Sequence, residues 1–196
     1  SIDEVISGLK GTIYYSPLES LRQKGQAALP ACETAVDMLY FKTVWKIKEK
    51  YLSGQEKKDL TQCFGTRMDM LNLQWICRAK KYYHLPEGEI YAMIIPISLH
   101  LKKTEIRAMA QAEDVEQVYA LIRNSWYGRL DLGNLEKGQS LEEPCREVID
   151  RIYELTSRKE PYSASVLNSY LYFKEREIEK IITTIERIRY GVAAGI

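Results

Sequence analysis

The sequence contains few of the residues that interrupt helices, with 11 Gly and 6 Pro among 196 residues. Long uninterrupted elements, helices first among them, are therefore expected. The sequence also has no excess of one charge, because 28 Lys and Arg stand against 27 Asp and Glu. This balance argues against a general nucleic-acid-binding protein, and the 45% of apolar residues argues against intrinsic disorder. The length suits one ordinary domain or two small lobes.

Long hydrophobic runs are absent as well. The longest apolar run, residues 90–97, is interrupted by Pro96 and is too short to cross a bilayer, so no transmembrane segment is predicted. The chain begins at Ser1 rather than Met, and no charged start precedes an apolar stretch, so no signal peptide is expected. These features predict a soluble protein.

Metal and catalytic motifs are missing from the sequence. The four cysteines lie far apart and form no CxxC pair, and there are two histidines, so we expect reduced, buried thiols and no metal. The phosphate-binding glycine loops, GxSxG and HExxH are absent, and no two carboxylates have an apolar setting that would separate their pKa values. We therefore predict no catalytic residue and no cofactor.

Apolar residues recur at helical spacing over most of the chain, as at Val36, Tyr40, Val44, Ile47 and Tyr51. No alternating strand pattern ends in a hairpin turn. The fold is predicted to be all-α. The expected helices lie near residues 2–9, 17–26, 31–52, 55–83, 86–94, 103–111, 114–123, 141–158 and 162–191. Charges of both signs alternate on their polar faces, as in residues 174–180 (KEREIEK), which predicts solvated faces with local ion pairs.

An internal repeat relates the two halves of the chain. A shift of 113 residues aligns Cys32, Asp37 and Tyr40 with Cys145, Asp150 and Tyr153, and a shift of 108 aligns Asp69, Leu73 and Tyr82 with Glu177, Ile181 and Tyr190. Any two amphipathic helices align loosely, but the shift of 113 also aligns a turn motif, since Lys10, Thr12 and Tyr14 fall on Arg123, Ser125 and Tyr127. Chance should not keep one shift through a turn motif and a helix motif. We therefore predict two helical lobes, residues 1–112 and 113–196, each containing an antiparallel pair of long helices. Such repeated lobes usually bind other proteins.

The repeated polar residues allow two interpretations. In the structural one, Asp37 and Asp150 lie in the first turns of their helices, where a carboxylate interacts well with the helix dipole. Tyr40 and Tyr153, one turn later, then pack between helices. In the functional one, the acids and Asn72 face a shared cavity and contact a partner.

Four longer segments carry a resemblance to a known family. Residues 2–18 and 113–130 are similar to its recurring Leu-x-Gly-Thr-x-Tyr unit, and residues 69–90 to its Asp-x-x-Asn-Leu segment followed by a basic helix. Residues 165–192 resemble its C-terminal signature, from Tyr-Leu-x-x-Lys-Glu to Ile-Arg-Tyr-Gly. The family is that of the C subunit of the bacterial and archaeal V/A-type ATPase/ATP synthase, equivalent to the d subunit of the eukaryotic vacuolar proton pump.

The resemblance implies a non-catalytic coupling role. Family members are funnel-shaped and all-helical; they sit at the cytoplasmic face on the membrane rotor ring and receive the central stalk, so that torque drives or is driven by proton or sodium transport. They have three pseudo-equivalent lobes, so this chain is expected to be a fragment lacking the first. Lys180 stands where the family commonly has Asn in its last repeat, while Asn72 keeps it. By this analogy the candidate partner contacts are Asp37, Asp69, Asn72, Arg78, Asp150, Glu177 and Lys180.

Two other functional hypotheses stay open. A generic helical-repeat adaptor of another complex would share the fold without the stalk and ring partners. An unrecognised enzyme would require a deep pocket that joins several carboxylates with perturbed pKa values.

Overall fold

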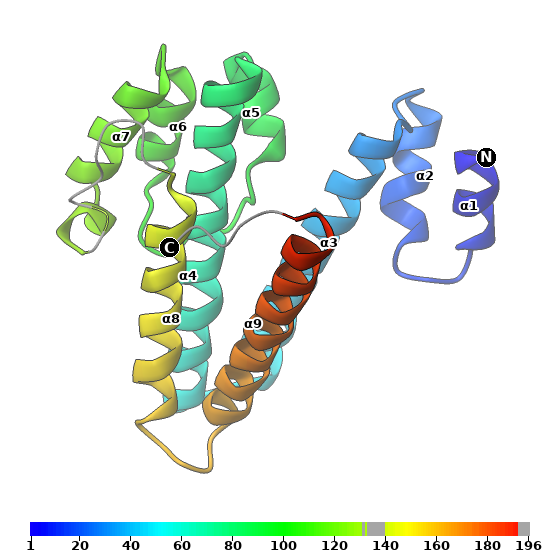
Figure 1. The fold of residues 1–196 in the computed structure, drawn as a ribbon. Helices are drawn as coiled ribbons and strands as arrows, with labels where there is room; N and C mark the ends of the chain where they lie inside the picture. The colour runs from blue at the N-terminus through cyan, green and yellow to red at the C-terminus, as the bar shows by residue number, and fades with distance from the viewer. Residues whose placement is uncertain (131, 133–139, 192–196) are drawn as a thin grey trace.

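A computed structural model describes residues 1–130, 132 and 140–191, and every regular element in these residues is helical (Figure 1). The predicted all-α fold is confirmed. The α-helices are α1 Ile2–Gly8, α2 Tyr15–Gln23, α3 Leu29–Tyr51, α4 Gly54–Arg78, α5 Glu87–Met93, α6 Lys103–Gln111, α7 Val115–Asn124, α8 Glu142–Ser157 and α9 Ala164–Arg189. Their ends lie within three residues of the predicted ones, except that the last turn of the predicted 55–83 helix is a π-helix, Ala79–Tyr83. The end of the predicted second lobe, residues 192–196, lies outside the described residues.

Local signals set several of these helix ends. Ser1 and Glu4 form a capping box at α1, and the Asp114 carboxylate accepts the backbone N–H of Gln117 at 2.8 Å to start α7. His84 ends the π-helical turn in the left-handed region, with φ of 49°. Gly54, with φ of 57°, makes the tight turn that reverses the chain from α3 into α4.

Two long helix pairs, α3–α4 and α8–α9, form the centre of the molecule. Helix α4 packs along α8, and α9 follows α8 after a short connection (Figure 1). Helices α1 and α2 cover the first half of α3, whereas α5, α6 and α7 lie at the opposite side of the molecule, against the upper half of α4. The main hydrophobic core lies where α4, α5–α7 and α8 meet.

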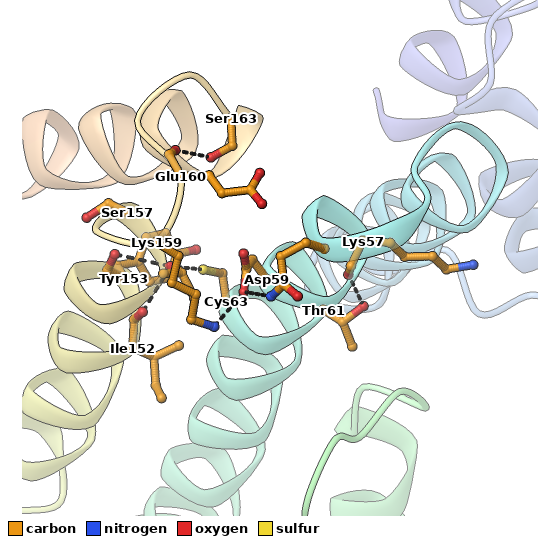
Figure 2. A network of polar contacts seen from close by, with 12 residues as sticks. Lys57, Asp59, Thr61, Cys63, Ile152, Tyr153, Ser157, Lys159, Glu160 and Ser163 are labelled. Carbon is orange, nitrogen blue, oxygen red and sulfur yellow. Dashed lines mark hydrogen bonds and ion pairs between the residues drawn. The ribbon is translucent and has the colours of Figure 1, made fainter.

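The lower ends of α4 and α8 are joined by polar contacts (Figure 2). Cys63 Sγ lies 3.2 Å from Thr156 Oγ1, and Lys159 Nζ makes an ion pair of 2.7 Å with the buried Asp59 carboxylate. The Glu56 carboxylate accepts the backbone N–H of Ala164 at 3.0 Å and so caps the start of α9. These contacts fix the turn between α8 and α9 against the start of α4.

The first-turn placement of the repeated acids is wrong. Asp37 and Asp150 are each the ninth residue of their helix, because α3 begins at Leu29 and α8 at Glu142. At that depth the interaction with the helix dipole is weak. Both helices nonetheless begin 113 residues apart, the shift found in the sequence. The division into two repeated lobes stays a prediction.

Candidate functional site

Asp69 lies inside the molecule and fixes a connecting segment against α4. Its carboxylate is fully buried and accepts the backbone N–H groups of Leu99, His100 and Leu101 at 3.2, 2.8 and 3.2 Å. The Tyr127 hydroxyl donates a fourth hydrogen bond of 2.8 Å. Burial raises the pKa of Asp69, and these four donors oppose that change.

Asn72, one helical turn later, holds the same segment at a second point. Its amide oxygen accepts the backbone N–H of Ile95 at 2.8 Å, and its amide nitrogen donates to the Ile95 carbonyl at 3.1 Å. Gly65 permits the close approach, since a Cβ there would lie 2.7 Å from Leu99 Cβ. The Asp-x-x-Asn pair therefore has an intramolecular role, and neither side chain reaches the surface in this structure.

A polar groove of about 220 Å³ runs between α4, α8 and α9. Its lining side chains include four arginines and three glutamates, together with a few apolar and aromatic ones. The lining residues are Arg67, Leu71, Gln74, Arg78, Glu142, Arg146, Ile149, Tyr172, Glu175, Arg176 and Glu179. We call this the arginine groove. It is the place where the structure gathers charge from all three helices.

Ion pairs across the groove connect the three helices. Arg78 of α4 lies 2.6 Å from Glu142 of α8, with both side chains about half exposed. Asp150 of α8 lies 3.3 Å from the largely buried Arg176 of α9 and accepts the Tyr172 hydroxyl at 2.6 Å. Burial, together with Asp150, raises the pKa of Tyr172. Of the predicted contact residues, the structure brings Arg78 to this groove and places Asp150 behind it, bound to Arg176.

A second, more apolar groove of about 680 Å³ lies between α3, α4 and α9. It shares Arg67, Tyr172, Glu175 and Glu179 with the arginine groove, so the two grooves meet beside α9. Helix α9 is therefore a ridge with open space along both sides.

The other predicted contact residues lie apart from the arginine groove. Asp37 is exposed on α3, and Glu177 and Lys180 are exposed on α9. Glu177 makes an ion pair of 2.6 Å with Lys174, and this interaction lowers the pKa of Glu177. The structure thus divides the seven predicted residues among the interior, the groove and two exposed helix faces.

Most residues of the arginine groove could not be recognised from the sequence. The prediction of a solvated face for residues 174–180 is right for the Lys174–Glu177 pair, but Arg176 reaches Asp150 on α8 and Glu175 lies 3.6 Å from Arg67 on α4. Mixed charges at helical spacing are compatible with ion pairs within one helix and with ion pairs between helices. Arg146, in the groove, had no signal beyond its charge.

Two of the buried cysteines, Cys63 and Cys77, are held as thiols by their surroundings. Burial raises the pKa of Cys63 to about 11 and of Cys77 to about 12, so both stay thiols near neutral pH. No three His, Cys, Asp or Glu side chains come together as metal ligands within the described part of the chain. The arginine groove carries charged side chains from three helices.

None of the helices among the described residues combines the length and apolar character needed to span a bilayer.

The described residues thus form an all-helical protein built of long helix pairs, with an open, charged groove between α4, α8 and α9. Comparison with known proteins gives the family: the model of the ATP synthase (C/AC39) subunit family matches residues 1–195, and the chain belongs to that family. The C subunit of the A-type ATP synthase of Pyrococcus horikoshii is 27% identical over an alignment of 190 residues that covers 92% of this chain and 49% of the relative. That of Pyrococcus abyssi is 27% identical over 98% of this chain and 52% of the relative. The chain spans about half the length of these curated relatives.

Proposed function

We propose that this chain acts as a non-catalytic subunit of a V/A-type rotary ATPase/ATP synthase, in the central-stalk socket that links the rotor stalk to the membrane ring. In this role it passes torque between the two sectors during proton or sodium transport. It works on the cytoplasmic side, peripheral to the membrane, with the stalk proteins and the ring as its partners. The observation that carries the proposal is the family match over residues 1–195.

The stiffness of the helix pairs supports a torque-bearing role. A socket that transmits torque must not deform under load, and α4 is held on several sides. Asp69 and Asn72 fix residues 95–101 to α4, while Asp59 and Cys63 join it to α8 and the turn that follows. Buried, fully bonded polar contacts of this kind rigidify a fold.

The arginine groove supports binding of a charged partner surface. Its side chains come from α4, α8 and α9, so a partner seated there would contact both helix pairs at once. Arg78 and Arg146 are about half exposed and remain accessible to a partner even while paired with Glu142 and Glu143. Such side chains set specificity and association rate more than raw affinity.

Capture by purified stalk proteins and by the membrane ring tests the proposal. Both the present chain and a chain extended to the length of the curated relatives serve as bait. We expect stalk binding that weakens about tenfold in Arg78→Glu/Arg146→Glu. Arg107→Glu is the matched control, because Arg107 lies on α6 in a similar surface ion pair with Glu87.

Two results would count against the proposal. If the extended chain binds neither stalk nor ring, the generic helical adaptor becomes the better hypothesis. If stalk binding is equally strong in the groove variant and the control, the partner sits elsewhere than in the arginine groove.

A further inference from the structure

The charges that line the arginine groove are spread unevenly over its three helices. Among the described residues, α4 and α8 contribute Arg67, Arg78 and Arg146 to the lining, with Glu142 as their single acid. The remaining lining acids belong to α9. The part of the groove that α4 and α8 form is therefore positively charged. Because guanidinium groups bind carboxylates through two parallel hydrogen bonds, this part is suited to the Asp or Glu side chains of a partner.

Glu142 occupies the most exposed of these three arginines. Its Oε1 lies 2.6 Å from Arg78 Nη2, and the two side chains are 52% and 48% exposed. An ion pair that is so accessible to water contributes little net free energy, because water solvates both groups when they separate. A partner's carboxylate can therefore replace Glu142 on Arg78 at little cost.

The other two arginines of α4 and α8 do not depend on Glu142. Arg146 is paired at 2.7 Å with Glu143, which lies outside the lining of the groove. Arg67 lies 3.6 Å from Glu175 of α9. Separation of Glu142 from Arg78 leaves both of these pairs intact, so a partner's carboxylate on Arg78 would have two further arginines beside it.

The start of α8 does not need the Glu142 carboxylate either. Glu142 is the first residue of α8, and its backbone N–H donates to Ser140 Oγ at 3.3 Å. Glu143 also lies in the first turn, so a favourable interaction with the helix dipole remains when the charge of Glu142 is removed. Glu142 can therefore be substituted without loss of the helix.

We propose that the α4–α8 side of the arginine groove binds an acidic surface of the stalk, and that Glu142 is an internal competitor for that surface. In the free chain the Glu142 carboxylate occupies Arg78, and in the complex a carboxylate of the stalk takes its place. The apparent affinity is then reduced by the fraction of molecules in which Arg78 is already paired. This inference rests on the proposed function, and it adds the chemistry of the partner.

Dissociation constants for purified stalk proteins test the competition. Glu142→Gln removes the charge and keeps the shape, so it should tighten stalk binding about fivefold by freeing Arg78. In an Arg78→Gln background the same change should gain less than about twofold, because no arginine is left to free. Glu87→Gln is the matched control, since Glu87 is 43% exposed in a surface ion pair with Arg107 and does not line the groove. Circular dichroism confirms that each variant is folded.

Peptides of one charge test the groove without the stalk. A short oligoglutamate peptide should bind the 196-residue chain more tightly after Glu142→Gln, and the gain should shrink at high salt. An oligolysine peptide should show no such gain, because the substitution removes a negative charge.

Stalk binding that is equal or weaker in Glu142→Gln overturns the inference and leaves the proposed stalk role standing. Oligoglutamate binding that is unchanged by Glu142→Gln also overturns it, because Arg78 would then not be masked. A gain for oligoglutamate, with no stalk binding by the wild-type chain or the variant, supports an acidic partner for the groove and counts against the stalk role.

Discussion

The two long helix pairs place equivalent residues in different surroundings. Tyr40 and Tyr153 are both the twelfth residue of their helix, yet Tyr40 is 55% exposed and Tyr153 is 1% exposed. Tyr153 stacks on Tyr172 at 4.1 Å between ring centroids, beside Cys63 of α4. Helix α8 packs against both α4 and α9, whereas α3 packs against α2 and α4.

Helices α4 and α9, the second helices of the two pairs, also place equivalent residues in different surroundings. Asp69 and Asn72 of α4 are buried because residues 95–101 pack over them. Their repeat equivalents on α9, Glu177 and Lys180, are exposed. Residues at equivalent positions of the predicted repeat share a place along their helix, but the segment packed against that helix decides whether the side chain is buried.

The largest expected effect comes from removing the buried carboxylate. Asp69→Ala leaves three backbone N–H groups and the Tyr127 hydroxyl buried without an acceptor, which should lower the free energy of unfolding by about 4 kcal/mol. Urea unfolding measures this. Glu177→Ala, at the equivalent exposed position, should leave the free energy of unfolding nearly unchanged. Equal losses of unfolding free energy in the two variants would show that burial does not distinguish Asp69 from Glu177.

The two tyrosines give the next largest difference. Tyr153→Ala opens a cavity beside Tyr172 and Cys63 and should cost about 3 kcal/mol of folding free energy. Tyr40→Ala should cost under about 1 kcal/mol, since water already reaches that side chain. Thermal unfolding of both variants provides the check, and a Tyr40→Ala loss as large as that of Tyr153→Ala would mean that something covers α3 in solution.

Substitutions of the repeated acids Asp150 and Asp37 should differ less in their effect on the free energy of unfolding. Asp150→Asn weakens the interaction with Arg176 and should cost about 1 kcal/mol, because the pair is only partly exposed. Asp37→Asn, on the exposed face of α3, should be close to neutral. Chemical denaturation at low and high salt tests the pair, and the Asp150→Asn loss should shrink at high salt.

The smallest expected effect is a pH dependence from His100. This side chain stacks on Trp126 at 3.6 Å between centroids, and burial lowers its pKa. The unfolded chain therefore takes up the proton first, so the contribution to stability is complete above about pH 6.5 and decreases as the pH falls below it. His100→Gln should flatten the stability profile between about pH 7 and pH 5. A profile unaltered by His100→Gln would show that other groups set it.

The helices could be predicted because each depends on nearby residues. Apolar spacing and the scarcity of glycine and proline place the helix ends within three residues, except at the end of α4. The Asp69-x-x-Asn72 motif was also visible, but its burial was not, since that depends on residues 95–101 about 25 residues away. A carboxylate that accepts backbone hydrogen bonds and one that meets a partner have the same signature in sequence.

The helical class, most helix ends and the family resemblance could be read from the amino-acid sequence, and the repeat is predicted from it, because all of these depend on local periodicity or on the order of residues along one chain. Which charges pair between helices, and which of the two tyrosines is buried, could be seen only once the helices were packed together. The physical reason is that a helix face is amphipathic whatever lies against it. Burial, pairing and pKa depend on the neighbour, and that neighbour comes from a distant part of the chain.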